Sequence, residues 1–207
     1  MRGKKNPYKK PDAFTKKAKD AGYPARSVYK LEEIDRRVQL FRPGMHVLDL
    51  GAAPGSWTLY AAQRIGANGR LLAIDVTPIT IAIPPNCTFC VGDAFSIDNH
   101  QLSTYAPYDV VINDMAPSTT GNRLQDQTRS YDLFMRALEV AKALLKPRGS
   151  FVGKIFMGED FPFARKALKD AFNVDRVIRP EGTRSMSYEI FLIGIDRKGD
   201  ETPSQST

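Results

Sequence analysis

Carboxylates that could carry chemistry lie where four predicted strands end. Asp49 lies near the end of a buried apolar run, Asp75 ends the next run, and Asp93 follows the third. The fourth run ends in residues 113–117, which include Asp114. The carboxyl ends of parallel strands meet at one edge of a sheet, where such sheets bind ligands. We therefore expect these carboxylates to border one site, with Asp75 placed to accept the ribose hydroxyls of a nucleoside.

The turn after the first of these strands indicates which nucleoside the site takes. A dinucleotide fingerprint needs glycines at its first, third and sixth positions, where this chain has Gly51, Ala53 and Ser56. Pro54 also removes an amide donor that a diphosphate would need at the start of the following helix. The turn therefore favours S-adenosylmethionine, which carries no phosphate, and leaves a nicotinamide dinucleotide as the alternative.

One lysine lies inside an otherwise apolar predicted strand, and two more charged residues have apolar neighbours. Lys154 interrupts residues 150–156, Glu189 opens the last predicted strand, and Lys30 lies beside the apolar stripe of the first long helix. Burying such a charge is unfavourable unless it has a partner. An ion pair that stabilises the core would explain Lys154, but a role in a reaction is favoured because Asp114 ends the neighbouring strand.

The scaffold that positions these residues is predicted to be an α/β sheet. Val28, Leu31 and Ile34 recur at helical spacing, so we expect a helix over residues 25–38. An alternation of strands and helices is typical of a mostly parallel sheet with helices on both faces. Strands are predicted near residues 45–50, 70–75, 87–91, 108–113, 149–156, 174–179 and 188–195, with further helices near 129–146 and 161–171.

Basic residues are concentrated at the N-terminus of the chain. Residues 1–30 hold ten Lys or Arg against two Asp, whereas the rest of the chain carries a net charge of −1. Such a segment, with Tyr8, Phe14 and Tyr23 interleaved, is typical of proteins that bind the phosphates of nucleic acid. The alternative is a solvated tail that only aids solubility.

Length and hydropathy predict one domain that stays in the cytoplasm. A chain of 207 residues with 42% hydrophobic content can bury a full core, and no apolar run approaches the ~20 residues of a membrane span. The basic N-terminus has no apolar segment behind it and so does not resemble a secretory signal. We predict a basic arm over residues 1–24, a single enzyme domain over 25–196 and a disordered tail over 197–207.

Cys87 and Cys90 form a C-x-x-C pair, a spacing found in metal and redox sites. The surrounding residues have the pattern of a strand, in which an offset of three directs the two thiols to opposite faces. The thiols could then neither bridge each other nor share a metal ion. We therefore expect two reduced cysteines and no metal site.

Several motifs together resemble the FtsJ/RrmJ family of RNA 2′-O-methyltransferases, over about residues 17–195. The matching motifs are SVYKLEEI (27–34), LGAAPGSW (50–57), NDMAP (113–117), GK (153–154) and SYE (187–189). Ser56 stands where the commonest cofactor loop of the family has a second glycine, which is a small departure from the pattern. The resemblance implies a single Rossmann-like, class I S-adenosylmethionine-dependent methyltransferase domain. Its seven-stranded sheet would be mostly parallel, with an antiparallel last strand.

The resemblance also implies which residues bind and react. The catalytic lysine, aspartate, lysine and glutamate of the family fall on Lys30, Asp114, Lys154 and Glu189, and its cofactor contacts fall on Gly55, Trp57, Asp75, Asp93 and Asp114. Lys154 could accept the proton of a ribose hydroxyl, or it could stabilise the forming alkoxide as a cation. The sequence leaves both roles open, and neither requires a metal.

RNA is the substrate that the resemblance implies, and we expect a monomer that binds neither membrane nor metal. The chain is most similar to the bacterial branch that methylates a uridine in large-subunit (23S) ribosomal RNA, and a transfer RNA is the alternative. A non-catalytic RNA-binding scaffold of the same fold would be expected to lose one of the four catalytic residues, and all are present. Amino methylation is disfavoured because it usually accompanies an Asn/Asp-Pro-Pro-aromatic turn, which residues 113–117 lack.

Overall fold

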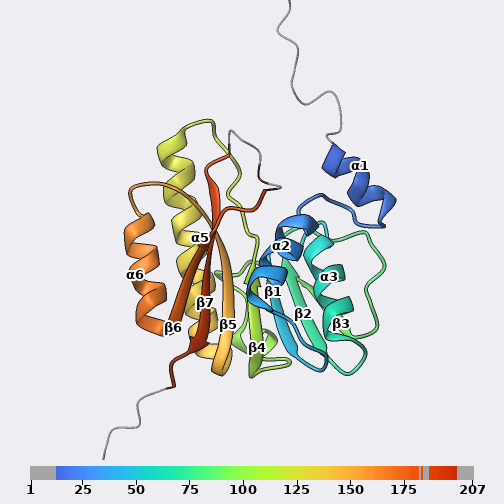
Figure 1. Cartoon of the computed structure of the whole chain (residues 1–207). Helices are drawn as coiled ribbons and strands as arrows, with labels where there is room; N and C mark the ends of the chain where they lie inside the picture. Colours follow the sequence, from blue (N-terminus) through green and yellow to red (C-terminus); the bar gives the residue numbers. More distant parts are fainter. Residues whose placement is uncertain (1–12, 182, 184–186, 200–207) are drawn as a thin grey trace, which may run out of the picture.

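The protein is built around one twisted sheet of seven strands (Figure 1). The computed structural model describes residues 13–181, 183 and 187–199. The strands are β1 (His46–Leu50), β2 (Arg70–Asp75), β3 (Cys87–Val91), β4 (Tyr108–Asn113), β5 (Leu145–Phe156), β6 (Phe172–Ile178) and β7 (Glu189–Arg197). Their order is β3-β2-β1-β4-β5-β7-β6. The first five strands pair in parallel, whereas β7 runs antiparallel to both β5 and β6.

Helices cover both faces of this sheet (Figure 1). Helices α2 (Val28–Val38) and α3 (Ser56–Ile65) pack on one face, and α4 (Asn99–Leu102), α5 (Arg123–Leu144) and α6 (Phe161–Ala171) pack on the other. Each face therefore has its own apolar core, and successive strand residues point alternately into the two cores. The predicted fold class, a mostly parallel seven-stranded sheet with an antiparallel last strand, is confirmed.

The predicted strands agree closely with the observed ones, and the main difference concerns α5. This helix begins at Arg123 rather than near residue 129, because the side chain of Asn122 caps it and accepts a hydrogen bond from the Gln125 amide at 3.3 Å. The first turns of α5 are largely polar, so its apolar stripe starts too late to mark its beginning. The following strand also starts earlier than predicted, at Leu145 rather than residue 149.

The two cysteines of β3 lie on opposite faces of the sheet, as predicted. Cys87 packs against the core under α2 and α3, whereas Cys90 packs against the core under α5. Both are free thiols, and burial raises the pKa of Cys87 to about 12. Within the described ranges, no group of three or more His, Cys, Asp or Glu side chains is arranged to hold a metal ion.

A short helix, α1 (Ala13–Asp20), lies inside the predicted basic arm and was not predicted from the sequence. Its Ala18 is fully buried, and its Phe14 packs on Tyr29 of α2 with ring centroids 5.9 Å apart. The ammonium of Lys17 lies 4.6 Å from the centre of the same Tyr29 ring. The first part of the arm, residues 1–12, and most of the predicted tail, residues 200–207, lie outside the described residues.

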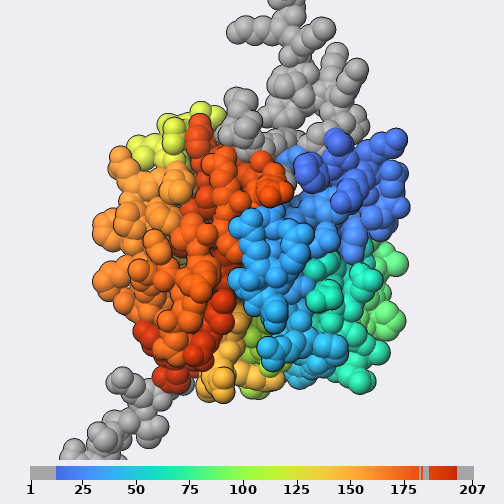
Figure 2. Space-filling model, viewed as in Figure 1, coloured from blue at the N-terminus to red at the C-terminus, as the bar shows by residue number. Residues whose placement is uncertain are grey.

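The chain that follows β6 lies beside the N-terminal helices on the face shown in Figure 2. The backbone amide of Glu181 donates a hydrogen bond of 2.8 Å to the side chain of Glu33 in α2. This bond joins two segments that are far apart in the sequence, and it holds α2 against the C-terminal half of the sheet. None of the helices that the structure describes is long and apolar enough to cross a membrane.

Candidate active site

A cavity of about 350 Å³ opens beyond the carboxyl ends of β1, β2, β3 and β4. It lies where the chain order changes direction, between β1 and β4, which is where open α/β sheets bind their ligands. Three of the five predicted cofactor residues line this cavity, namely Asp75, Asp93 and Asp114. The other lining residues are Gly51, Ala53, Ile74, Val76, Thr77, Gly92, Ala94, Met115, Ala116, Ser118 and Leu133.

The charge of this cavity decides between the two nucleoside ligands. Its lining contains three carboxylates, and no Lys, Arg or His is among its lining residues, all of which belong to the described part of the chain. A diphosphate would be repelled there, whereas the sulfonium and ammonium groups of S-adenosylmethionine would be attracted. The acidic lining of the cavity therefore fits S-adenosylmethionine, which supplies a methyl group on a positively charged sulfur.

Asp75 holds the shape of the cavity as well as lining it. Its Oδ2 accepts a hydrogen bond of 2.9 Å from the Ala53 amide, and its Oδ1 accepts one of 2.7 Å from the Thr77 amide. The first of these bonds joins the turn after β1 to the end of β2, and the second holds the loop that follows β2. Each oxygen of a carboxylate can accept a second hydrogen bond, so Asp75 can still receive the ribose hydroxyls of a nucleoside.

Asp93 lies in a short loop that α5 holds in place. Its Oδ1 accepts a hydrogen bond of 3.0 Å from the Phe95 amide. The next residue, Ala94, receives a 2.7 Å hydrogen bond on its backbone oxygen from Nε of Arg136 in α5. The cavity wall on this side is thus supported by a helix more than forty residues further along the chain.

The glycines of the turn allow backbone segments to approach one another closely. A Cβ on Gly51 would lie 2.5 Å from the Met115 backbone nitrogen, so any side chain at this position would displace the wall after β4. Gly55 adopts a φ of 106°, and a Cβ there would collide with the side chain of Ile81. Gly55 itself is not among the residues that line the cavity.

Trp57, another predicted cofactor residue, has its side chain in the core rather than in the cavity. Trp57 as a whole is 2% exposed, and its ring packs on Phe191 of β7 with centroids 5.6 Å apart. Its Nε1 donates a hydrogen bond of 2.9 Å to the backbone oxygen of Ser27. Trp57 therefore anchors α3 to the start of α2, and it is not among the residues that line the cavity.

Asp49 is a buried carboxylate beside the cavity to which the sequence assigned no specific role. Its Oδ2 accepts a hydrogen bond of 2.7 Å from the Thr58 hydroxyl, whereas its Oδ1 has no partner among the described residues. Burial raises the pKa of Asp49 to about 7 against the opposing effect of the Thr58 hydrogen bond, and the charges of Asp114 and Asp75 raise it further. A cationic ligand nearby would stabilise the ionised form of this carboxyl.

Lys154 forms an ion pair with Asp114 at the rim of the cavity. Its Nζ lies 2.8 Å from Oδ1 of Asp114 and also donates to the backbone oxygen of Asp114. The side chain of Lys154 is only 6% exposed, and that of Asp114 is 17% exposed. An ammonium has three N–H donors, so one donor of Lys154 is left for a substrate oxygen. Because Asp114 also lines the cavity, this ion pair connects Lys154 to the cavity wall.

Lys30 and Glu189 form a second ion pair, between α2 and the start of β7. The Lys30 Nζ lies 2.5 Å from Oε1 of Glu189, and the two side chains are 12% and 11% exposed. In the register of β5 and β7, Lys154 pairs with Phe191 and Glu189 with Phe156. Side chains two residues apart share a face of a strand, so Lys154 and Glu189 lie on the same face of neighbouring strands.

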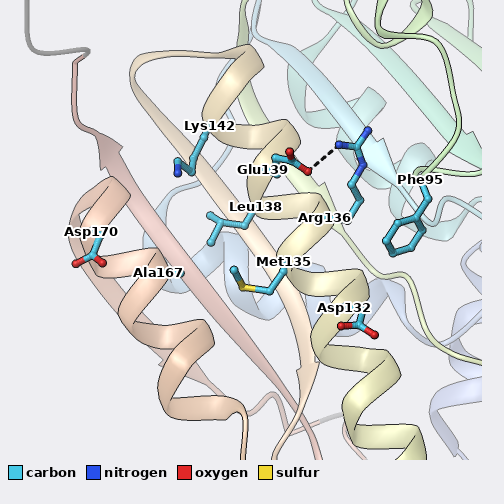
Figure 3. Close-up of a pocket in the computed structure, with 9 residues that line it drawn as sticks. All are labelled: Phe95, Asp132, Met135, Arg136, Leu138, Glu139, Lys142, Ala167 and Asp170. Carbon is cyan, nitrogen blue, oxygen red and sulfur yellow. Dashed lines mark hydrogen bonds and ion pairs between the residues drawn. The ribbon is translucent and has the colours of Figure 1, made fainter.

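The four predicted catalytic residues thus form two ion pairs on one face of the sheet, beside the cavity. A larger hollow, of about 830 Å³, lies elsewhere, on the outer side of α5 and α6 (Figure 3). Its lining includes an ion pair of 2.8 Å between Arg136 and Glu139, together with Met135 and Leu138. None of the predicted site residues lines this hollow.

Sequence reasoning missed the part of the cavity wall that comes from more distant segments. Met115 and Ser118 follow β4 and form one side of the wall, and Leu133 of α5 reaches it from a helix. Met115 belongs to a matched motif, so the signal for it was present. Leu133 belongs to the apolar stripe of α5, and nothing in its sequence context distinguishes it from a core residue.

Known proteins are similar to this chain in sequence over nearly its whole length. Residues 23–197 match the FtsJ-like methyltransferase family. The chain is 66% identical over 194 residues to the ribosomal RNA large subunit methyltransferase E of Sorangium cellulosum, covering 94% of this chain and 92% of that protein. A protein of the same name from Oleidesulfovibrio alaskensis is 50% identical over 191 residues, covering 91% of this chain and 92% of the relative.

A solved structure shares the fold at much lower sequence identity. The crystal structure of a Plasmodium falciparum protein assigned as a ribosomal RNA methyltransferase has a TM-score of 0.76 and 22% identity, covering 86% of this chain and 100% of that one. This likeness concerns the fold alone, whereas the sequence matches identify the family. The chain is therefore a member of the FtsJ-like methyltransferase family, an enzyme that takes its methyl group from S-adenosylmethionine.

Proposed function

We propose that this enzyme methylates the 2′-oxygen of a ribose in RNA, and that its target is a uridine in the 23S RNA of the large ribosomal subunit. The observation that carries the proposal is the Lys154–Asp114 ion pair, which joins the buried Lys154 amine to the wall of the cavity. The large-subunit RNA target is supported by the names of the relatives that are 66% and 50% identical. Such a target places the enzyme in the cytoplasm.

A ribose hydroxyl needs help to react because it is a poor nucleophile until its proton leaves. Lys154 is the residue proposed to meet the 2′-oxygen, and its remaining N–H can stabilise the negative charge that forms there. The same amine accepts the proton if it reaches the oxygen in its neutral form. Asp114 fixes the position of the amine through two hydrogen bonds, so the reacting oxygen is held next to the cofactor cavity.

Lys30 and Glu189 are proposed to position the ribose rather than to react with it. Both side chains are largely buried and hold each other in a single ion pair, which leaves the remaining donors of Lys30 for an oxygen of the substrate. Because Glu189 shares its face of the sheet with Lys154, a ribose held by this pair would present its 2′-oxygen to Lys154. Both ion pairs and the cavity come from one chain, so we propose that a monomer is the active form.

The segment after β4 favours oxygen over nitrogen as the methyl acceptor. Amino methyltransferases usually place an Asn/Asp-Pro-Pro-aromatic turn at this point, where carbonyl oxygens grip the amine. Here Asp114 and its backbone oxygen are both occupied by Lys154, and the following residues are Met115 and Ala116. A substrate amine would have to compete with Lys154 for these two acceptors.

The experiment is methyl transfer from isotopically labelled S-adenosylmethionine to purified large ribosomal subunits, to naked 23S RNA and to transfer RNA. Digestion to nucleosides followed by mass spectrometry identifies the methylated atom. We expect labelled 2′-O-methyluridine from the large subunit or its RNA. Label in transfer RNA alone would favour the alternative target, and label on a base would contradict ribose methylation. An absence of transfer to every RNA would support a non-catalytic RNA-binding scaffold.

A further inference from the structure

An exposed tyrosine stacked with an arginine lies immediately beside the candidate catalytic residues. The guanidinium carbon of Arg123 lies 3.9 Å from the centre of the Tyr188 ring. Tyr188 is 44% exposed, which is unusual for a large side chain so close to a buried ion pair. Neither side chain has a part in the mechanism proposed above.

The position of Tyr188 is set by the backbone at the start of β7. Tyr188 directly precedes Glu189, and its backbone oxygen accepts a hydrogen bond of 2.8 Å from the Met157 amide at the end of β5. Met157 follows the strand that carries Lys154. Glu189 turns toward Lys30 of α2, whereas the ring of Tyr188 meets Arg123, the first residue of α5. The aromatic ring is therefore held at a fixed place on the side of the site opposite α2.

Two exposed apolar residues lie next to the stacked pair in the chain or across the backbone bond. Leu124 follows Arg123 in the chain and is 60% exposed. Met157, whose amide donates to the Tyr188 backbone oxygen, is 44% exposed. RNA-binding proteins recognise unpaired bases by stacking them on aromatic rings and on the flat guanidinium groups of arginines. Arg123 also brings a positive charge to the ring, which suits the phosphates on either side of a base.

We propose that Arg123 and Tyr188 form a stacking platform for an unpaired nucleobase of the RNA, at or next to the nucleotide whose ribose is methylated. The platform deepens the function proposed above, on which it rests, by assigning a base-contacting surface to the same site. Stacking would fix the base, and Lys30 with Glu189 would fix the ribose. The 2′-oxygen would then be presented to Lys154 in one orientation.

The test compares RNA probes that carry or lack bases. One probe is a single-stranded oligouridylate, and the other is an abasic ribose-phosphate oligomer of the same length and charge. Fluorescence anisotropy measures the affinity of each probe for the wild-type enzyme and for Tyr188→Ala and Tyr188→Phe. Arg148→Ala is a control for the loss of a surface side chain away from the site, because Arg148 is 89% exposed and lies at the opposite end of β5.

The wild-type enzyme should bind the base-bearing probe about five- to a hundredfold more tightly than the abasic probe, the range expected for stacking of one base. Tyr188→Ala should reduce this ratio nearly to one, whereas Tyr188→Phe and Arg148→Ala should keep it. The melting temperature and the affinity for S-adenosylmethionine should be unchanged in Tyr188→Ala, which separates stacking from folding. An unaltered ratio in Tyr188→Ala would overturn the platform.

A failure of the stacking platform can be distinguished from a failure of the proposed methyltransferase function. Methyl transfer by the wild-type enzyme to large ribosomal subunits reports on the function alone. If that activity is present and Tyr188→Ala has the wild-type KM for the subunit and the wild-type binding ratio, the platform is wrong and the function stands. If the wild-type enzyme methylates no RNA ribose, the function is wrong, while the ratio of the two probes still decides whether Tyr188 stacks a base.

Discussion

Replacing Asp49 with asparagine should make the protein more stable above neutral pH and less stable in acid. Asp49 is fully buried, its Oδ1 has no partner among the described residues, and its pKa is raised from 3.8 to about 7. The folded protein therefore binds one more proton than the unfolded chain between about pH 4 and pH 7. The contribution of Asp49 to the stability should therefore fall as the pH rises through that window and then level off, because Asp49 is ionised in both states above it.

The size of the effect follows from the raised pKa. Each pKa unit corresponds to about 1.36 kcal/mol, so a rise from 3.8 to about 7 lowers the stability by about 4 kcal/mol once Asp49 is ionised. Asparagine does not ionise, and its amide oxygen can keep the hydrogen bond from Thr58. Its amide nitrogen would lack a partner, which costs about 1–3 kcal/mol. The net gain at pH 8 is therefore about 1–3 kcal/mol, and near pH 4 the variant should be less stable than the wild type.

Urea unfolding of the two proteins between pH 5 and pH 8 measures this difference. The carboxylates that the two proteins share cancel in the comparison, so the variant should gain about 2–3 kcal/mol relative to the wild type across the range. The affinity for S-adenosylmethionine provides a second measurement, because a cationic ligand favours ionised Asp49. Binding should tighten with rising pH more in the wild type than in Asp49→Asn. A stability difference that does not change with pH would refute the reasoning.

Three further predictions concern the cofactor, the ribose and the arm. Asp75→Ala should weaken S-adenosylmethionine binding about ten- to a hundredfold in calorimetry without changing RNA affinity, because a charged acceptor is removed; unchanged cofactor affinity would contradict its placement. Glu189→Gln keeps an acceptor for Lys30 but removes the charge, so methyl transfer should fall about ten- to a hundredfold while cofactor binding holds; wild-type turnover would argue against positioning by this pair. Deleting residues 1–12, which hold five Lys or Arg, should weaken RNA binding and reduce the log–log salt slope by about 0.7–0.9 for each phosphate that the segment neutralises. Parallel salt slopes for the full-length and shortened proteins would mean that the segment neutralises no phosphates.

The parts of the structure that the sequence predicted are those with a strong local signal. Strands such as β2 (Arg70–Asp75) are short apolar runs bounded by polar residues, and their bounds were predicted almost to the residue. The carboxylates at their ends then followed from the geometry of a parallel sheet. Lys154 stood out because a lysine in a buried strand needs a partner, and the structure pairs it with Asp114.

The parts that the sequence did not predict depend on packing between distant segments. α1 is short, and it is held by packing on Tyr29 rather than by a strong apolar stripe of its own. The unpartnered oxygen of Asp49 depends on which groups happen to surround it after folding. The stacking of Arg123 on Tyr188 joins residues more than sixty positions apart, and neither residue is unusual in its local sequence.

The most direct test of the account is methyl transfer by Lys154→Ala, measured together with its cofactor binding. Labelled S-adenosylmethionine and large ribosomal subunits would be incubated with the variant or the wild type, and 2′-O-methyluridine would be quantified by mass spectrometry. The variant should bind S-adenosylmethionine as the wild type does, because Lys154 does not line the cofactor cavity. Its rate of methylation should fall by about two to four orders of magnitude. Near wild-type 2′-O-methylation by a variant with intact cofactor binding would contradict the role of Lys154, and with it the proposed site of the reaction.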